Sequence, residues 1–424
     1  MKPEYITKLH VKNIGPFDNL NVVFSPDVTV IVGPNGSGKT SILRAITHCF
    51  TKDNREYFRY RVGARLCTYF QKGEERAKCG GKVFDLKCDT SLHQRVSPFY
   101  EREEAEDGII SYQYTQHPYN VLAIGAHRYF DFVQLEGMKV EENTAAQRES
   151  YAKNNPLYIE KPLLPHVKQW MVNRYFIVEK PWGKDLKDNW DKLIEKIPRL
   201  SPPGHDLKFE RIEEDLNPIF SLDGRECYLE ELSSGFKSVL SIVLSIINWI
   251  EGVNDGERRK IENACGTVLI DEIEAHLHPA WQKMILKVIT GMFPNLQFIV
   301  TTHSPYVIAS AEKNQVILLP VLNSNMDVKP VENNYAGWRV EYILQDLMGT
   351  EVISSPNLTG ILESLERAIG AKDQASYNSG MVELKTLVNG KDSIVSVYEM
   401  RGAETFESDG KSTKSSRAND IDGK

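Results

Sequence analysis

The feature that most constrains this chain is a glycine-rich loop that follows an apolar run. The run Val28–Val32 predicts a buried strand, and the residues after it, Gly33-Pro34-Asn35-Gly36-Ser37-Gly38-Lys39-Thr40, fit the phosphate-binding pattern G-x-x-x-x-G-K-[ST]. Glycines permit backbone angles that strain other residues, so successive N–H groups can point at phosphate oxygens where a helix begins. The loop predicts a nucleoside triphosphate site with the contact residues Asn35, Gly36, Ser37, Gly38, Lys39, Thr40 and Ser41.

The last two residues of the loop have separate expected roles. Lys39 should reach the β- and γ-phosphates, and Thr40 offers a hydroxyl group to Mg²⁺. Ser41 to Phe50 continues as an apolar-rich helix that gives the loop a rigid base. ATP and Mg²⁺ are therefore the predicted cofactors.

A second apolar run ends in paired carboxylates. Thr267–Ile270 predicts a strand, and Asp271 and Glu272 follow it directly. Ligands of open α/β sheets bind at the carboxyl ends of the strands. We expect Asp271 to hold Mg²⁺ through its water shell and Glu272 to polarise the water that attacks the γ-phosphate.

Two further strand ends carry candidate functional residues. The predicted strand Gln297–Val300 leads to Thr301-Thr302-His303-Ser304-Pro305, so His303 should lie at the same sheet edge and donate a hydrogen bond to the γ-phosphate or the attacking water. Glu272 and His303 are thus the predicted catalytic residues. Arg128 follows the predicted strand Val121–Gly125, where it could sense phosphate, hold lobes together or form a plain surface salt bridge.

Strands that alternate with helices predict an α/β fold with a parallel sheet. The strands ending at Asp271 and at Thr301 are separated by a predicted helix, Pro279–Thr290, as in βαβ units. Longer helical patterns run from about Asp131 to Asp215, and Phe220–Leu229 with Asp223-Gly224 at its middle predicts a β-hairpin. Lys82–Cys88 is another predicted strand, and helices are predicted at Val340–Leu347 and Leu358–Ile369.

Charge and cysteine content limit the classes of partner. The net charge is −7, so any nucleic-acid contact must come from a local patch or a partner; the clusters Arg55–Lys78 and Arg258–Lys260 are candidates, although solvated loops are the better interpretation. The six cysteines contain no C-x-x-C pair, and the longest apolar stretch, Val239–Ile250, falls short of the roughly 20 residues of a membrane span. A cytoplasmic protein without membrane contact is predicted.

The order of four motifs resembles the ABC-type ATPases of the SMC and RecF group over residues 1–320. The motifs are the phosphate loop, Leu232-Ser233-Ser234-Gly235, Leu269-Ile270-Asp271-Glu272 and Thr302-His303-Ser304. The resemblance implies an ABC-type P-loop NTPase head in which Ser233 and the backbone of Gly235 bind the γ-phosphate held by another protomer, so that ATP joins two heads. A serine hydroxyl and N–H groups at a helix start suit that role, while a simple helix cap is the alternative.

We expect the following domain organisation. A nucleotide-binding core lobe with a mixed or parallel sheet comprises residues 1–130 and 265–322, and an inserted helical lobe with the signature motif comprises residues 131–264. A small C-terminal helical extension should cover residues 323–403. The polar tail 404–424 is predicted to be disordered.

The segment Asp271–Gln282, with Phe293–Ile299 and Thr301–Pro305, resembles bacterial AAA-type, OLD-like ATPases of anti-phage modules such as the Septu system and retron-linked operons. The resemblance implies head-to-head dimers or higher oligomers that control a separate effector, in Septu an HNH nuclease, with nucleic acid contacted through the complex. His276 and His278 would then belong to a dimer-interface loop. Two histidines without a third ligand are a poor metal site.

Two other functions stay open. A DNA-repair clamp of the RecF type would close its heads on DNA directly and would show DNA-stimulated hydrolysis. A transporter subunit fits less well, because the chain has a large insertion between the Lys39 helix and Ser233 and an extension past Pro320. Ser234 and Phe236 also stand where transporters carry Gly and Gln. The last hundred residues show no HNH pattern, and Asp420-Ile421-Asp422 sits in a polar segment, so we expect any nuclease activity to come from a partner.

Overall fold

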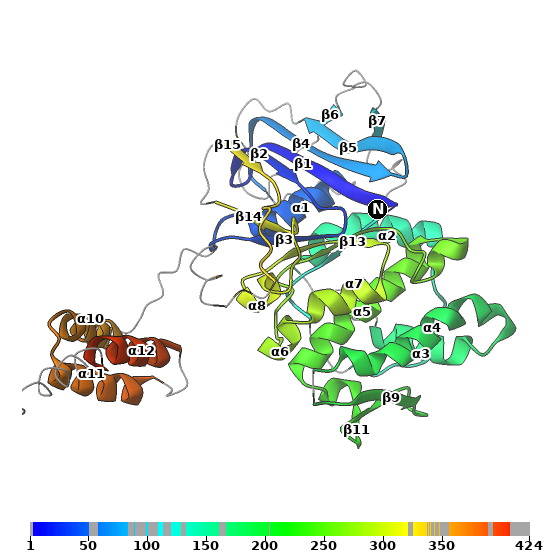
Figure 1. Cartoon of the computed structure of the whole chain (residues 1–424). Helices are drawn as coiled ribbons and strands as arrows, with labels where there is room; N and C mark the ends of the chain where they lie inside the picture. The colour runs from blue at the N-terminus through cyan, green and yellow to red at the C-terminus, as the bar shows by residue number, and fades with distance from the viewer. Residues whose placement is uncertain are drawn as a thin grey trace, which may run out of the picture. The chain divides into compact units, whose positions relative to one another are not determined.

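The computed structural model forms two compact units, Met1–Met348 and Gly349–Lys424 (Figure 1). It describes residues 3–50, 58–83, 89, 99–100, 109–112, 120–128, 133–160, 167–202, 204–320, 325–336, 338, 340, 343, 347, 356–388 and 393–407. The expected α/β architecture is confirmed, with parallel and antiparallel sheets in the first unit.

The N-terminal part of the first unit is a largely antiparallel sheet with the strand order β15-β2-β1-β4-β5-β6, in which β7 also pairs with β5. Its strands are β1 (Glu4–Ile14), β2 (Phe17–Val23), β4 (Tyr60–Lys72), β5 (Glu75–Val83), β6 (Phe99–Tyr100), β7 (Ile109–Tyr112) and β15 (Asn325–Val328). β5 lies earlier than the predicted strand Lys82–Cys88, whose residues after 83 are outside the described ranges. Because β15 pairs with β2, the first unit reaches beyond the predicted boundary at 322.

The second sheet is parallel and holds the predicted strand ends at one edge. Its order is β14-β3-β13-β12-β8, formed by β3 (Val28–Val32), β8 (Val121–Ile124), β12 (Gly266–Ile270), β13 (Leu296–Thr301) and β14 (Val316–Leu318). Strands that are apolar throughout suit a sheet covered on both faces. Alternate residues enter two separate cores: Ile31 and Ile299 pack with the helix α1, whereas Val30 and Val300 pack with α5.

Helices cover both faces of the parallel sheet. Figure 1 shows α1 between the two sheets, with α5 and α7 on the other side of β3 and β13. The helices of the first unit are α1 (Lys39–Cys49), α2 (Thr144–Tyr158), α3 (Val167–Ile177), α4 (Lys184–Lys196), α5 (Ser234–Val253), α6 (Pro279–Gln282), α7 (Ile285–Met292) and α8 (Pro305–Ile308), with short 3₁₀ turns at Pro181–Gly183, Ile197–Leu200, Leu229–Glu231 and Gly256–Arg259.

Helix α5 is longer than the apolar stretch predicted from the sequence. Its 20 residues are long and apolar enough to cross a membrane, but 89% of the 18-residue apolar stretch within it is buried inside the protein. α5 is therefore placed as a core helix. Before α5 the chain forms a three-stranded antiparallel sheet in which β10 (Pro218–Leu222) pairs with β11 (Arg225–Tyr228) on one side and on the other with β9 (Leu207–Ile212), a strand that the sequence did not predict. The predicted hairpin is confirmed, because Leu222 pairs with Arg225 across Asp223 (φ 53°) and Gly224 (φ 81°), the positive angles of a type I′ turn.

The predicted helix Pro279–Thr290 is wrong as one continuous element. The chain forms α6 and α7 with a break at Lys283 and Met284, where the N–H of Met284 bonds to the carbonyl of Trp281, three residues back. This tighter turn ends α6 after a single turn. Because of this break, the side chains of α6 do not continue the faces of α7.

A buried amide ties the two sheets together. The side chain of Gln297, on β13, accepts from the N–H of Ile6 (2.8 Å) and donates to the carbonyls of Ile6 (2.9 Å) and Ser25 (2.8 Å). Its oxygen also accepts from the hydroxyl of Thr267 on β12 (2.5 Å). Four protein groups thus satisfy one fully buried side chain, as burial of an amide requires.

The second unit contains three helices, α10 (Pro356–Gly370), α11 (Gln374–Leu387) and α12 (Ser393–Glu407). They share a small core of their own that includes Leu365, Leu384 and Val395. α10 confirms the predicted helix at Leu358–Ile369, and α12 continues past the predicted start of the tail at 404. Most of Val340–Leu347 and all of 408–424 lie outside the described residues.

Candidate functional site

The phosphate loop connects β3 to α1 and is open at its crest. Asn35 and Gly36 are exposed, whereas Ser37 is 1% exposed and its hydroxyl has no hydrogen-bond partner among the described residues. Gly36 (φ 79°) and Gly38 (φ 92°) take left-handed backbone angles. At Gly38 a side chain is also excluded by space, since a Cβ atom would lie 2.6 Å from the ring of Phe17.

Lys39 is held over the loop by main-chain oxygens. Its ammonium group donates to the carbonyls of Gly33 (2.9 Å) and Pro34 (3.0 Å). Burial lowers the pKa of Lys39, and the carboxylates of Asp271, Glu272 and then Glu274 act in the opposite direction. A cation placed in this way, beside an accessible row of amides, is suited to phosphate oxygens.

A hydroxyl group and a carboxylate form the candidate Mg²⁺ site. The hydroxyl of Thr40 lies 3.1 and 3.0 Å from the two carboxylate oxygens of Asp271, and the hydroxyl of Thr301 lies 2.6 Å from the first of them. Mg²⁺ prefers oxygen ligands of this kind and keeps several waters. The residues present therefore fit the ion. Asp271 is only 5% exposed, so its orientation is fixed by these contacts.

Glu272 is exposed to solvent, unlike the buried Asp271 before it. It has a φ of 45°, which is uncommon for a residue with a side chain. Its N–H donates to the hydroxyl of Thr301 (2.8 Å), and its carbonyl accepts from the N–H of Ala275 (2.8 Å). Thr301, which the sequence analysis did not single out, thus positions both carboxylate residues from the neighbouring strand.

Arg128 is not a surface residue, so the salt-bridge interpretation at the surface is wrong. It is 2% exposed, and its guanidinium donates to the carbonyls of Asp271 (3.3 Å) and Glu272. Burial lowers its pKa to about 10, against the attraction of Glu274 first and then Asp271 and Glu272. Arg128 stays charged at neutral pH and supports the main chain beneath the catalytic candidates.

His303 follows β13 and is half-buried. Its N–H donates to the carboxylate of Glu274, whose other oxygen has no partner among the described residues. Because β13 lies between β3 and β12, His303 comes to the same sheet edge as the phosphate loop and Glu272. The sequence missed Glu274, and its only signal was a third acid two residues after Glu272.

The signature residues begin α5. Ser233 occupies the cap position, but its side chain makes no capping hydrogen bond, so the helix-cap alternative does not account for its hydroxyl. Ser233 is exposed, whereas Gly235 is buried against Trp281: a Cβ atom at 235 would lie 2.3 Å from the indole. His278 caps α6, accepting from the N–H of Ala280 (3.3 Å), while His276 is exposed.

The candidate nucleic-acid patches are largely paired. Arg258 forms an ion pair with Glu4 (2.9 Å), and Lys260 with Glu257 (3.0 Å). In the first cluster, Arg55 lies outside the described residues, while Arg61 pairs with Asp18. The solvated-loop interpretation is wrong for the first cluster, most of which lies on β4 and β5, whereas Arg258 and Arg259 lie in the short 3₁₀ turn Gly256–Arg259.

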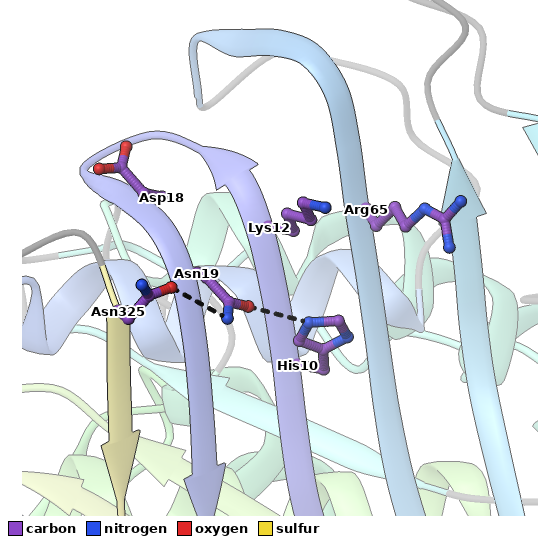
Figure 2. Close-up of a pocket in the computed structure, with 6 residues that line it drawn as sticks. All are labelled: His10, Lys12, Asp18, Asn19, Arg65 and Asn325. Carbon is purple, nitrogen blue, oxygen red and sulfur yellow. Dashed lines mark hydrogen bonds between the residues drawn. The ribbon is translucent and has the colours of Figure 1, made fainter.

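A hollow of about 470 Å³ lies elsewhere, on the outer face of the antiparallel sheet (Figure 2). It is lined by His10, Lys12, Asp18, Asn19, Arg65 and Asn325. Leu9 and Val11, which alternate with His10 and Lys12 along β1, pack in the core with α1, so the hollow opens away from that helix. Its mixture of cations, an anion and amides does not form part of the phosphate site.

Comparison with known proteins agrees with this geometry. Residues 5–321 match the family model described as the RecF/RecN/SMC N terminal domain. The chain is 26% identical to the Septu protein PtuA of Bacillus thuringiensis over 409 residues, which is 94% of this chain and 98% of the relative. It is also 26% identical to the Retron Ec83 probable ATPase of Escherichia coli, over 80% of this chain and 76% of the relative.

Among solved structures, the SMC head domain from Thermotoga maritima aligns with 77% of this chain and 99% of its own, at 17% identity and a TM-score of 0.42. The assignment does not depend on this weak likeness. It rests on the family model, which covers most of the chain including the phosphate loop, the signature, Asp271, Glu272 and His303. This chain belongs to the RecF/RecN/SMC N-terminal domain family of ATPases.

Proposed function

We propose that this chain hydrolyses ATP between two copies of itself and that the paired heads control a separate effector nuclease in anti-phage defence. The observation that carries the proposal is the meeting of four strand ends at one sheet edge. β3 brings Lys39, β12 brings Asp271 and Glu272, β13 brings His303, and β8 brings Arg128. Each residue comes from a different part of the sequence, and no structural need of the sheet explains all of them together.

The proposed reaction transfers the γ-phosphoryl group to water. Lys39 exchanges the carbonyls of Gly33 and Pro34 for phosphate oxygens and offsets their charge. Thr40 and Asp271 would hold Mg²⁺, and the ion would supply positive charge to offset that of the phosphates. Glu272 accepts a proton from the attacking water, whose oxygen bonds to the γ-phosphorus while the bond to the bridging oxygen breaks, giving ADP and phosphate. His303 donates a hydrogen bond to the γ-phosphate.

Ser233 completes the proposed site from the second copy. Its hydroxyl is exposed and makes no capping bond, and it stands at the positive end of a 20-residue helix. No hydrogen bond joins Ser233 to the phosphate loop of its own chain within the residues that the structure describes. Paired heads would allow the serine of one copy to contact the γ-phosphate bound by the other, as the resemblance implies.

Complementation between two inactive variants tests this pairing. Lys39→Ala disables a phosphate loop, and Ser233→Arg disables a signature, so each homodimer should lack hydrolysis. A mixed dimer contains one site with both halves intact, and random pairing makes half of the dimers mixed. We therefore expect an equimolar mixture to recover about a quarter of the parental ATPase rate.

The matched control mixes Lys39→Ala with Thr40→Ala. Both changes disable the phosphate-loop half of the site, so each mixed dimer keeps no complete site and activity should not return. Activity in the first mixture no higher than in the control would show that Ser233 does not act across a dimer.

The effector role is supported by the relatives, which are the Septu protein PtuA and a retron ATPase, and the proposal implies a cytoplasmic location. We expect ATP to increase the binding of a candidate effector nuclease. Co-purification with the Glu272→Gln protein measures this binding, which should be reduced at least severalfold with Lys39→Ala. The second candidate, a DNA clamp, is favoured by two matches to the DNA replication and repair protein RecF, each over less than a quarter of the chain. Hydrolysis stimulated by DNA alone, and weakened steeply by salt, would favour the clamp instead.

A further inference from the structure

Helix α6 lies between the two regions that serve different ATP sites in the proposed dimer. It follows the loop that carries Asp271, Glu272 and Glu274, and it ends after one turn. Its last two residues, Trp281 and Gln282, contact different parts of the protein. Gln282 contacts the segment after β13, and Trp281 contacts the start of α5.

Gln282 connects this loop to the residue next to His303. Its amide nitrogen donates to the carbonyl of Leu277 (2.7 Å), and its amide oxygen accepts from the hydroxyl of Ser304 (2.5 Å). Ser304 is 5% exposed and also caps α8, accepting from the N–H groups of Tyr306 (3.1 Å) and Val307 (3.3 Å). A displacement of the segment that carries His303 and Ser304 therefore acts directly on Gln282, because the Ser304 hydroxyl that bonds to Gln282 is also held by the N–H groups at the start of α8.

Trp281 connects the same turn to the signature. It is 6% exposed, its ring packs edge to face against Phe236 with centroids 4.7 Å apart, and it closes over Gly235. Its indole N–H donates to the carbonyl of Leu200 (2.7 Å), which fixes the ring in place. A second link joins the same regions, since the hydroxyl of Ser238 on α5 donates to the carbonyl of Ala275 (3.0 Å).

The geometry points to Trp281 and Gln282 as positioning residues that couple the two ATP sites of a dimer. This inference rests on the proposed function. In each subunit, His303 contacts the ATP of its own phosphate loop and Ser233 contacts the ATP of its partner. Gln282 and Trp281 join these two residues through adjacent positions of one short helix. Occupancy of one site then biases the signature that completes the other, which is a coupling free energy between two sites.

Three variants test the coupling in the full-length protein. Steady-state hydrolysis is measured against ATP concentration, and the parental Hill coefficient should exceed 1 and approach about 2, the number of sites. Gln282→Ala removes the bond to Ser304 and should return the coefficient to about 1. Trp281→Phe loses the indole N–H and part of the contact with Gly235, and should act in the same direction.

Gln282→Glu separates coupling from structural support. A glutamate keeps an acceptor for the hydroxyl of Ser304 but loses the donor to Leu277, so it should preserve cooperativity if the Ser304 contact is the link. If Gln282→Ala and Gln282→Glu lower the Hill coefficient equally, Gln282 acts by supporting Leu277 and the inference is overturned. Lys287→Ala, an exposed change on α7, is the control for substitution in this region.

The outcomes separate this inference from the proposed function. If the parental protein does not hydrolyse ATP, both fall. If it hydrolyses ATP with a Hill coefficient of 1, or if Gln282→Ala and Trp281→Phe keep the parental coefficient, the coupling is wrong and the proposed function stands. A variant that fails to fold is recognised by its thermal transition. Trp281→Phe, which preserves most of the buried area, then decides the result.

Discussion

Replacing Glu272 by glutamine preserves ATP binding and slows hydrolysis by about 100- to 10,000-fold, the usual contribution of a general base. Glutamine keeps the size and polarity of the side chain but cannot accept the proton of the attacking water. Because Glu272 is exposed and its main chain is held by Thr301 and Arg128, the substitution should leave the fold unchanged. With ATP and Mg²⁺, the variant should accumulate as a dimer in size-exclusion chromatography with light scattering.

Glu312→Gln is a suitable control, since it removes an exposed carboxylate without touching the site. It should hydrolyse ATP at the parental rate. A parental rate for Glu272→Gln itself would exclude Glu272 as the base and favour Glu274, a neighbouring acid with one oxygen that has no partner among the described residues.

The second large effect is expected for Lys39→Ala, which should weaken ATP binding by about 10- to 100-fold. Hydrogen bonds to charged groups contribute about 1.5–3 kcal/mol each, and the loop amides remain to hold part of the phosphate chain. Hydrolysis should fall below detection, because the developing charge on the phosphates loses its nearest cation. Binding is measured by calorimetry with a non-hydrolysable ATP analogue.

Lys313→Ala removes an exposed lysine outside the site and serves as the matched control. Truncation of Lys39 also removes its bonds to Gly33 and Pro34, so the thermal transition should be compared for the two proteins. Parental affinity in a folded Lys39→Ala protein would contradict the assignment of the loop as the phosphate site.

The sequence predicted best where local pattern and chemistry coincide. β3 and β12 are short apolar runs followed directly by Gly33 and Asp271, and β13 ends two residues before His303, so both the strands and the sheet edge could be anticipated. The turn Asp223-Gly224 was also predictable, because few residue pairs tolerate its backbone angles.

The elements that the sequence missed depend on distant partners. Strand β15 has only four residues, of which two are polar, and it forms by pairing with β2, which lies more than 300 residues earlier in the chain. The break between α6 and α7 leaves no mark in the apolar pattern, since Trp281 and Ile285 are spaced as in one helix. The indole of Trp281 instead packs on Gly235 and donates a hydrogen bond to the carbonyl of Leu200, and only the tertiary structure reveals these contacts.

The same holds for Arg128. An arginine after a strand is usually solvated, and nothing near it in the sequence signals that two main-chain carbonyls from residues 271 and 272 will receive it. The signature serine was recognised by resemblance, and the structure adds that its hydroxyl is not used as a cap.

Gln297 gives the first unit a mechanical property. Pulling β1 away from β13 would break both bonds between Ile6 and the amide of Gln297, and each buried polar group that is left unsatisfied costs about 1–3 kcal/mol. Separating the two sheets therefore costs free energy even while each sheet stays folded. The two sheets should lose their order in a single transition, and the nucleotide loop between them is shielded from partial opening by a side chain that never touches it.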